Sequence, residues 1–389
     1  MLYHRHTGFI ALLCLVAQRK GMVIFMKVLY ITTVGLTMGF FKLFIKELLD
    51  EGHTVDIATN ECDYPVADCY REWGCKIYPI SCSRSPFKSG NLRAIKEIKR
   101  IVSNGGYEIV HCHTPIAAAC TRLACKSLRK KGVKVIYTAH GFHFYKGAPK
   151  KNWILYYPIE KICAKWTDLL ITINKEDYEF ANRRIHAKKV EYVPGVGIEM
   201  DKFANTTVDK IKKRQEIGVP ENAFMLLSVG ELNENKNHQI VIKALAEVND
   251  PSIHYVIAGK GDKADELNIL AKEMQVHLHL LGYRTDVAEL YKVADAFVLP
   301  SFREGLNVSV MEALASGLPC LVSRIRGNVD MVNENVNGYY LDPFDIFSVA
   351  DSIKKTGRTD KNRVVESALI FDVKEINQKM MTLYHGVRE

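Results

Sequence analysis

The sequence lacks several features that would each assign it to a familiar class of proteins. It has 389 residues but no run of about 20 apolar residues, so it predicts no helix that spans a membrane. Its ten cysteines form no Cys-x-x-Cys pair, and a chain of this length does not need disulfides, so we expect reduced thiols in a cytoplasmic protein. Low-complexity tracts and short repeats are absent. No G-x-G-x-x-G follows the first apolar run, which excludes the common dinucleotide fingerprint.

The charge that the sequence does carry is unevenly distributed. Residues 26–195 hold 27 Lys and Arg against 16 Asp and Glu, a net charge of +11, whereas residues 196–389 hold 23 against 28, a net charge of −5. A basic half can attract anionic lipid headgroups, although an ordinary solvated surface explains the charge as well. Nucleic acid is a weaker alternative, because no known reader motif accompanies the charge. The basic residues gather at Arg93, Lys96, Lys99 and Arg100, at Arg129, Lys130 and Lys131, and at Lys146, Lys150 and Lys151.

Strand-like apolar runs alternate with helical stretches in both halves of the chain. This alternation and the length predict an α/β fold with two doubly wound, Rossmann-like domains that face each other across a cleft. The expected strands are residues 28–32, 55–59, 109–111, 135–138 and 169–173, then 224–228, 253–258, 276–281, 296–300 and 320–323. We expect an N-terminal extension over 1–25 with Met26 as a natural start, a first domain over 26–194, a Gly- and Pro-containing hinge over 195–205, a second domain over 206–365, and a C-terminal helix over 366–389 that can pack back on the first domain.

The most informative segment covers residues 301–317 and contains two carboxylates, Glu304 and Glu312. It follows the apolar run 296–300, passes through Gly305 and continues with helical periodicity. The free backbone N–H groups at the start of a helix suit a phosphate. Carboxylates eight residues apart lie about two helical turns apart, so they can accept hydrogen bonds from opposite ends of one ligand, such as a ligand with sugar hydroxyls. The alternative is a solvated helix with two unrelated surface acids.

Polar residues and glycines also follow other expected strands. Lys236 lies at the start of a helix, where an ammonium group can meet a diphosphate, and His140 directly follows a strand, where it can bond a sugar hydroxyl or a phosphate oxygen. Gly35 and Gly259 lie in loops through which a backbone can approach a phosphate, and Arg284 can flank a nucleobase. Each has an ordinary alternative, namely a solvated lysine, a structural histidine, a tight turn or a surface loop.

A pair of histidines, His111 and His113, raises the question of a metal site. In an extended segment these two side chains share one face, which is one arrangement that metal ligands adopt. The sequence offers no convincing third ligand, so we expect neither a metal nor a cofactor.

Taken together, these residues resemble the family-4 retaining glycosyltransferases, which have the two-domain GT-B fold. The resemblance covers Met26 to the C-terminus, is most specific from Glu304 to Gly317, and in the run 139–145 points to the bacterial capsule and exopolysaccharide branch. It implies that Glu304 contacts the donor sugar, that Glu312 contacts the nucleotide ribose, and that Lys236 binds the diphosphate. The catalytic residues that it implies are His140, Glu304 and Lys236. The donor-binding residues that it implies are Gly35, Lys236, Gly259, Arg284, Glu304, Gly305, Leu306, Asn307, Val308 and Glu312, with His143 and Arg303 as weaker candidates.

The resemblance also implies a reaction and its substrates. A hexose or N-acetylhexosamine would pass, with retention and without a metal, from a nucleoside-diphosphate sugar, expected to be a UDP-sugar, to a lipid-linked (polyprenyl diphosphate) saccharide acceptor. We expect this reaction at an anionic membrane surface, the inner face of the plasma membrane, in surface polysaccharide synthesis. One departure is Glu231, which stands where the family commonly has an arginine, and Arg303 or Arg284 can take over its role. Two alternatives stay open: a nucleotide-sugar epimerase of the same fold, and a catalytically silent sugar-nucleotide-binding protein.

Overall fold

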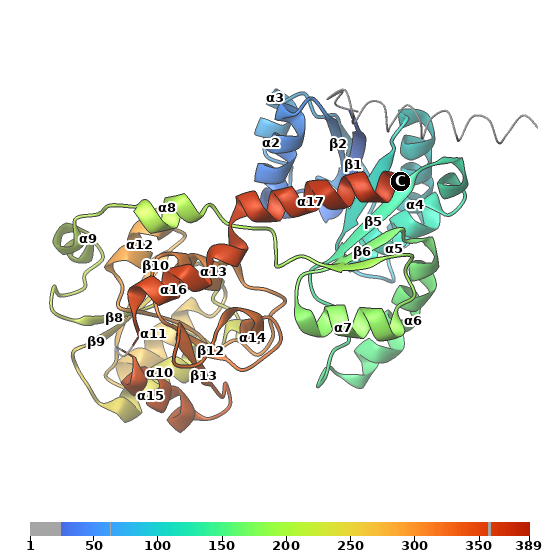
Figure 1. Cartoon of the computed structure of the whole chain (residues 1–389). Coiled ribbons are helices and arrows are strands. Elements are labelled where there is room, and N and C mark those ends of the chain that lie inside the picture. Colours follow the sequence, from blue (N-terminus) through green and yellow to red (C-terminus); the bar gives the residue numbers. More distant parts are fainter. Residues whose placement is uncertain (1–24, 63, 357–358) are drawn as a thin grey trace, which may run out of the picture.

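The computed structural model describes residues 25–62, 64–356 and 359–389. It contains two α/β domains side by side, and a C-terminal helix, α17 (Val373–Arg388), that runs from the second domain across the first (Figure 1). The expected N-terminal extension, residues 1–25, lies outside the described residues except for Phe25. Met26 is buried and forms part of the first domain's core.

The first domain is built on a seven-stranded parallel sheet with the order β3-β2-β1-β4-β5-β6-β7. One buried cluster lies between the sheet and α2, α3 and α17, and another lies between the opposite face and α4, α5 and α7. The strands are β1 (Lys27–Val34), β2 (Thr54–Asn60), β3 (Ile77–Pro79), β4 (Ile109–His113), β5 (Lys134–Ala139), β6 (Leu169–Thr172) and β7 (Val190–Tyr192). The helices are η1 (Gly35–Phe41), α2 (Lys42–Asp50), α3 (Cys69–Glu72), α4 (Gly90–Gly105), α5 (Pro115–Cys125), η2 (Leu128–Lys131), α6 (Lys150–Cys163), η3 (Ala164–Trp166) and α7 (Lys175–Arg184).

The second domain repeats this plan with a six-stranded parallel sheet in the order β10-β9-β8-β11-β12-β13. One face packs against α8, α12, α13 and α16, and the other packs against α10, α11 and α15. The strands are β8 (Phe224–Val229), β9 (Ile253–Ala258), β10 (His277–Gly282), β11 (Ala296–Leu299), β12 (Cys320–Ser323) and β13 (Gly338–Leu341). The helices are α8 (Met200–Asn205), α9 (Lys210–Glu216), η4 (Glu234–Lys236), α10 (His238–Val248), α11 (Ala264–Glu273), α12 (Val287–Val293), α13 (Val308–Ala315), α14 (Asn328–Met331), α15 (Ile346–Lys355), α16 (Lys361–Ser367) and η5 (Leu369–Phe371).

All ten strands expected from the sequence are present, which confirms the fold of two doubly wound domains. Three further strands, β3, β7 and β13, were not expected. Each has three or four residues and lies at an edge of its sheet. An edge strand has a neighbour on one side only and can be short, so its sequence does not need the continuous apolar run that marks a central strand.

The strand order reverses once in each sheet, between β1 and β4 and between β8 and β11. Ligands of open α/β sheets bind beyond the carboxyl ends of the strands at this switch point, because the connections there diverge to opposite faces. Lys236 follows β8 and Glu304 follows β11. The second sheet therefore places both residues at its switch point.

The two domains are connected by the segment after β7 and by α17. Within the segment expected as a hinge, Met200 and Phe203 belong to α8 and are buried in the second domain's core. The far end of α17 packs on the first domain, where Met380 and Tyr384 join the cluster beside β1 and the Tyr384 hydroxyl lies 2.8 Å from that of Tyr30. Of the helices in the described part of the chain, none is both long enough and apolar enough to cross a bilayer.

Candidate active site

Lys236 and Glu304 form an ion pair at the switch point of the second sheet. Nζ of Lys236 lies 2.7 Å from Oε1 of Glu304, and only 14% and 11% of the two side chains are exposed. Lys236 ends the short helix η4, which Asn233 caps by accepting a hydrogen bond from Lys236 N at 3.1 Å. The pair brings one cation and one anion to the same strand ends, where a diphosphate oxygen and a sugar hydroxyl can each find a charged partner.

Hydrogen bonds join the two loops that carry this ion pair. Phe302 N donates to Asn235 O at 2.9 Å, and Asn235 Nδ2 donates to the Arg303 carbonyl at 2.9 Å. Asn237, whose φ of 55° is left-handed, donates from Nδ2 to Pro343 O at 2.9 Å. Asparagine tolerates this conformation better than most residues. The Phe302 and Asn235 bonds therefore hold the Lys236 loop against the Glu304 loop, and the Asn237 bond joins the Lys236 loop to the loop after β13.

Glu312 lies on α13, and most of its side chain is shielded from solvent. The Tyr291 hydroxyl donates to Oε2 of Glu312 at 3.0 Å. Burial raises the pKa of Glu312 to about 7, although this hydrogen bond lowers it. At the start of α13, Asn307 Oδ1 accepts from Ser309 N at 2.9 Å and caps the helix. One end of this helix thus faces the Glu304 loop, and Glu312 lies further along it.

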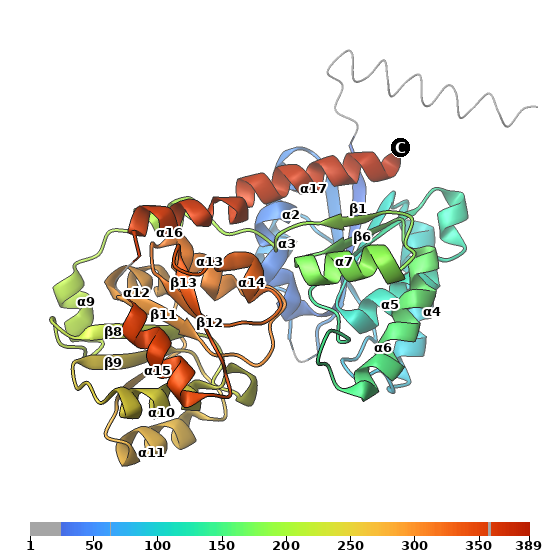
Figure 2. The same ribbon diagram turned by 60° about the horizontal axis from the view of Figure 1, so that its bottom comes forward.

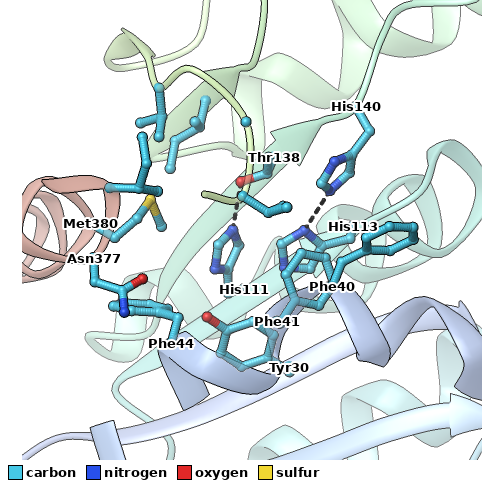
Figure 3. Close-up of a pocket in the computed structure, with 15 residues that line it drawn as sticks. Tyr30, Phe40, Phe41, Phe44, His111, His113, Thr138, His140, Asn377 and Met380 are labelled. Atoms are coloured by element: carbon cyan, nitrogen blue, oxygen red, sulfur yellow. Dashed lines mark hydrogen bonds between the residues drawn. The ribbon is translucent and has the colours of Figure 1, made fainter. Parts of the chain in front are cut away.

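His140 directly follows β5 and borders a cluster of histidine and aromatic side chains (Figure 3). Its Nε2 lies 3.1 Å from Nδ1 of His113, whose ring stacks on Phe41 with 4.0 Å between centroids. Burial lowers the pKa of His140 to about 4, so its imidazole is neutral near pH 7. The cavity that this cluster lines has a volume of about 40 Å³, room for about three water molecules. This cavity is too small to hold a sugar ring.

His111, whose ring lies against that of His113, makes a separate set of hydrogen bonds (Figure 3). His111 Nε2 lies 2.8 Å from Thr138 Oγ1, and its Nδ1 lies 2.6 Å from the Tyr384 hydroxyl on α17. The rings of His111 and His113 share one face, as expected, with centroids 4.1 Å apart. Both nitrogens of His111 are engaged in these bonds. Within the described ranges, no three His, Cys, Asp or Glu side chains are grouped so that they could hold a metal ion.

The two domains touch where the His140 loop meets the Glu304 loop. A Cβ atom on Gly305 would lie 2.3 Å from the carbonyl oxygen of His140, and a Cβ on Gly141 would lie 3.3 Å from Cα of Gly305. Gly141 also has a φ of 120°, which disfavours other residues. Only glycine allows this approach, so the two glycines bring the histidine and the glutamate loops together.

Comparisons with known proteins agree with this geometry. Residues 27–174 match the family described as "Glycosyl transferase 4-like", and residues 209–364 match "Glycosyl transferases group 1". The EpsD protein of Bacillus subtilis (strain 168), named as a glycosyltransferase, is 35% identical over 343 residues, which cover 85% of this chain and 87% of EpsD. The chain belongs to this glycosyltransferase family.

Two further similarities extend the comparison. The UDP-Gal:alpha-D-GlcNAc-diphosphoundecaprenol alpha-1,3-galactosyltransferase of Escherichia coli is 30% identical over 279 residues, which cover 68% of this chain and 71% of that protein. The crystal structure of Anabaena HepE in complex with UDP and glucose has a TM-score of 0.74 and 19% identity, and it covers 93% of this chain and 100% of HepE. The second likeness shows the GT-B fold, as the resemblance implied.

The other expected glycines of this glycosyltransferase lie in tightly packed loops. A Cβ on Gly35 would lie 2.4 Å from Tyr64 O, and a Cβ on Gly259 would lie 1.7 Å from Gly230 O. The Gly230 backbone in turn lies against the Lys236 side chain, because a Cβ there would approach Lys236 Cε to 3.4 Å. Close packing explains these glycines, and Gly259 also supports the loop beneath Lys236.

Glu231 stands where the family commonly has an arginine, and the two arginines expected to replace it differ in their freedom to bind a ligand. The Glu231 side chain is exposed and accepts a hydrogen bond from Asn233 Nδ2 at 2.8 Å. Arg284 is held by Asp286 at 2.5 Å and Glu216 at 2.7 Å, and these carboxylates raise its pKa. Arg303 is exposed and forms no ion pair with any residue that the structure describes. Of the two expected replacements, Arg303 has the uncommitted guanidinium.

Sequence reasoning missed two residues that contact the His140 loop. Arg326 follows β12 in the second domain, and Asp177 lies in the first turn of α7. Both come soon after the carboxyl end of a strand, which is the signal that identified Lys236 and Glu304. His143, a weaker candidate, packs its ring on Tyr156 with 4.6 Å between centroids.

Proposed function

We propose that this glycosyltransferase transfers a hexose or N-acetylhexosamine, with retention, from a UDP-sugar to a saccharide on polyprenyl diphosphate. The observation that carries the proposal is the Lys236–Glu304 pair at a strand switch point, on a loop that touches the backbone of His140. The name of the Escherichia coli relative specifies a UDP-sugar donor and a diphosphoundecaprenol-linked acceptor, which supports both substrate classes.

The donor diphosphate would bind between Lys236 and the start of α13. The ammonium group and the N–H groups of the helix supply positive charge where the leaving group develops negative charge. Glu304 would accept hydrogen bonds from the donor sugar, and Glu312 would accept them from the ribose. Arg303, on the same loop as Glu304, would supply the cation that Glu231 does not.

Retention follows from a same-face displacement. The bond between the anomeric carbon and the diphosphate oxygen breaks, the acceptor hydroxyl attacks from the same face, and its proton passes to the leaving diphosphate oxygen. In this mechanism no side chain forms a covalent intermediate with the sugar. Because His113 engages Nε2 of His140, Nδ1 is the nitrogen that His140 can offer to the sugar. Isolation of a covalent glycosyl-enzyme would contradict this route.

The acceptor lipid would bring the first domain to the inner face of the plasma membrane. Phe87, Leu92 and Ile154 are 82%, 69% and 77% exposed near the starts of α4 and α6, and Lys88 and Arg93 directly follow Phe87 and Leu92 in the sequence. Exposed apolar side chains flanked by cations suit binding to an anionic bilayer surface. Flotation with anionic liposomes should recover the wild type, and Leu92→Ser should recover less. Ile269→Ser, which changes a 59% exposed residue of the second domain, is the control. Equal recovery with neutral and anionic vesicles would contradict the attachment.

A donor panel tests the reaction. UDP- and GDP-sugars are incubated with a saccharide on polyprenyl diphosphate, and mass spectrometry records the product. We expect an acceptor longer by one sugar with a UDP-hexose or UDP-N-acetylhexosamine. Conversion of UDP-N-acetylglucosamine without an acceptor would instead indicate an epimerase. Binding of UDP without turnover on any acceptor would indicate a silent sugar-nucleotide-binding protein.

A further inference from the structure

Arg326 belongs to the second domain, but its guanidinium lies in the first. Nη1 donates to the carbonyl of Phe142 at 3.0 Å and to Oδ1 of Asp177 at 2.8 Å. The guanidinium also lies over the Tyr145 ring, 4.5 Å from its centroid. Arg326 and Asp177 are only 8% and 2% exposed, so water does not screen this pair as it screens a surface salt bridge.

The partners of Arg326 fix the segment that begins at His140. Asp177 accepts from Phe142 N at 3.0 Å through Oδ2, while its Oδ1 receives Arg326, so Phe142 is held on both sides of its backbone. Asn174 holds the Asp177 carboxylate in place by donating from Nδ2 to Oδ2 at 2.9 Å. Only Gly141 lies between His140 and Phe142 in the chain, so a movement of the Phe142 backbone also moves the His140 backbone.

Gly327, the next residue after Arg326, packs against the Glu304 loop. A Cβ on Gly327 would lie 2.1 Å from the carbonyl of Gly305, which itself abuts the His140 carbonyl. A second hydrogen bond joins the two domains nearby. Asp330 of α14 accepts it from Lys175 N, at the start of α7, at 2.8 Å. Figure 2 shows α14 beside α7 at this junction. The Arg326–Gly327 turn thus contacts both the histidine loop and the donor loop.

We propose that Arg326 is a positioning residue, which makes the placement of His140 beside the Glu304 loop depend on closure of the two domains. With the domains apart, Arg326 leaves Phe142 and Asp177, and the His140 segment loses one side of its clamp. The site is then complete only in the closed arrangement, which protects the sugar donor from reaction with water. This inference rests on the proposed function for its catalytic consequence, whereas the interdomain contact stands without it.

The test compares Arg326→Gln with Arg324→Gln in the full chain. Arg324 is a matched control, because it also lies over a tyrosine ring, that of Tyr340 at 5.1 Å, but stays within the second domain. We expect Arg326→Gln to lower kcat about 10- to 100-fold, the size of loss that misplaced catalytic groups cause. UDP affinity, measured by calorimetry, should change less than about threefold, because Lys236 and Glu312 are untouched. In small-angle scattering with UDP, the variant should have a larger radius of gyration than the wild type.

Each outcome decides the proposal. Wild-type kcat together with a wild-type scattering profile for Arg326→Gln would overturn it, and so would equal losses of kcat and UDP affinity, which indicate general destabilisation. Arg326→Lys keeps the charge but can reach fewer acceptors, so it should lie between wild type and Arg326→Gln and provides the test if the glutamine variant folds poorly. If the wild type turns over none of the donors, the proposed function fails, and the scattering comparison alone still decides whether Arg326 closes the domains.

Discussion

The two walls of the site differ in their charge. The wall from the second domain carries an ion pair, Lys236 with Glu304, and a further carboxylate, Glu312. The wall from the first domain carries histidines stacked with aromatic rings, and burial lowers the pKa of His140 to about 4 and that of His111 to about 3. The wall from the second domain therefore carries charged side chains, whereas the histidines of the wall from the first domain stay neutral at physiological pH.

This difference matches the two parts of a sugar nucleotide. A diphosphate needs cations and N–H groups, whereas a sugar ring beside it needs hydrogen-bonding groups that add no charge near the reacting carbon. A protonated histidine there would repel an oxocarbenium-like transition state. The burial that keeps His140 neutral therefore serves the chemistry proposed for it. Substitutions on each wall should then have separable effects on chemistry and on nucleotide binding.

The largest effect is expected from Glu304→Gln on the charged wall. This change keeps the shape but removes the anion that pairs with Lys236 and that we propose to contact the donor sugar. We expect kcat/KM to fall about 1,000-fold, or about 4 kcal/mol. Glu234→Gln, an exposed carboxylate on the neighbouring loop, is the control and should keep wild-type kinetics. A loss below about tenfold would remove Glu304 from the catalytic centre.

The next effect is expected from Lys236→Met. The ammonium group is lost, while the aliphatic chain over Gly230 is kept. UDP should bind about 100-fold more weakly, or about 2.7 kcal/mol, a typical value for charge-assisted hydrogen bonds to a diphosphate. Calorimetric titration with UDP measures the change. Lys260→Met, which alters an exposed lysine on the loop after β9, should bind UDP as the wild type does. Unchanged affinity in Lys236→Met would assign the diphosphate to other cations.

Much of this charged wall could be predicted from the sequence, because its parts are local. Glu304 and Glu312 lie on one strand–loop–helix segment, so the sequence places both after the same strand, with Glu304 in the loop and Glu312 on α13. The ion pair between Glu304 and Lys236 joins residues 68 positions apart. Parallel strands meet at one edge, so their proximity follows from the fold, but the 2.7 Å contact does not.

The neutral wall and the domain junction were largely beyond prediction. The hydrogen bond between His111 and Tyr384 joins residues 273 positions apart and depends on how α17 packs back on the first domain. Arg326 and Asp177 are 149 positions apart, and although each follows the end of a strand, nothing in their local sequences indicates that they pair with each other. The first contact is set by the packing of α17 on the first domain and the second by the way the two domains meet, and no periodicity or local spacing encodes either arrangement.

On the neutral wall, we expect His140→Phe to lower kcat about 10- to 100-fold and to leave UDP affinity unchanged within about twofold. The wild-type rate should show no histidine titration between about pH 5.5 and 8, because the pKa of His140 lies near 4. Stopped assays of kcat across this range, with calorimetry for UDP, measure both. His186→Phe, at an exposed position on the same domain, is the control. A rate that falls as pH drops through about 6.5 would show that this histidine titrates normally.

The smallest effect concerns Glu312, where binding and stability should oppose each other. Burial raises its pKa to about 7, above the value of about 4.3 in an unfolded chain, so the folded state holds this proton more tightly. The contribution of Glu312 to stability is therefore complete below about pH 4 and is lost as pH rises through 7. Glu312→Gln cannot ionise, so at pH 8 it should be more stable than the wild type by about 1 kcal/mol, a few degrees in Tm, with little difference at pH 5.

UDP should bind the wild type more tightly at pH 8 than at pH 6, because the ionised carboxylate is the better acceptor for ribose hydroxyls, and this pH dependence should vanish in the variant. Thermal melts and UDP titrations at these pH values measure both effects. Equal stability of the two proteins at pH 8 would show that Glu312 ionises as readily in the folded chain as in the unfolded one, and would place it with the solvated acids rather than in the charged wall.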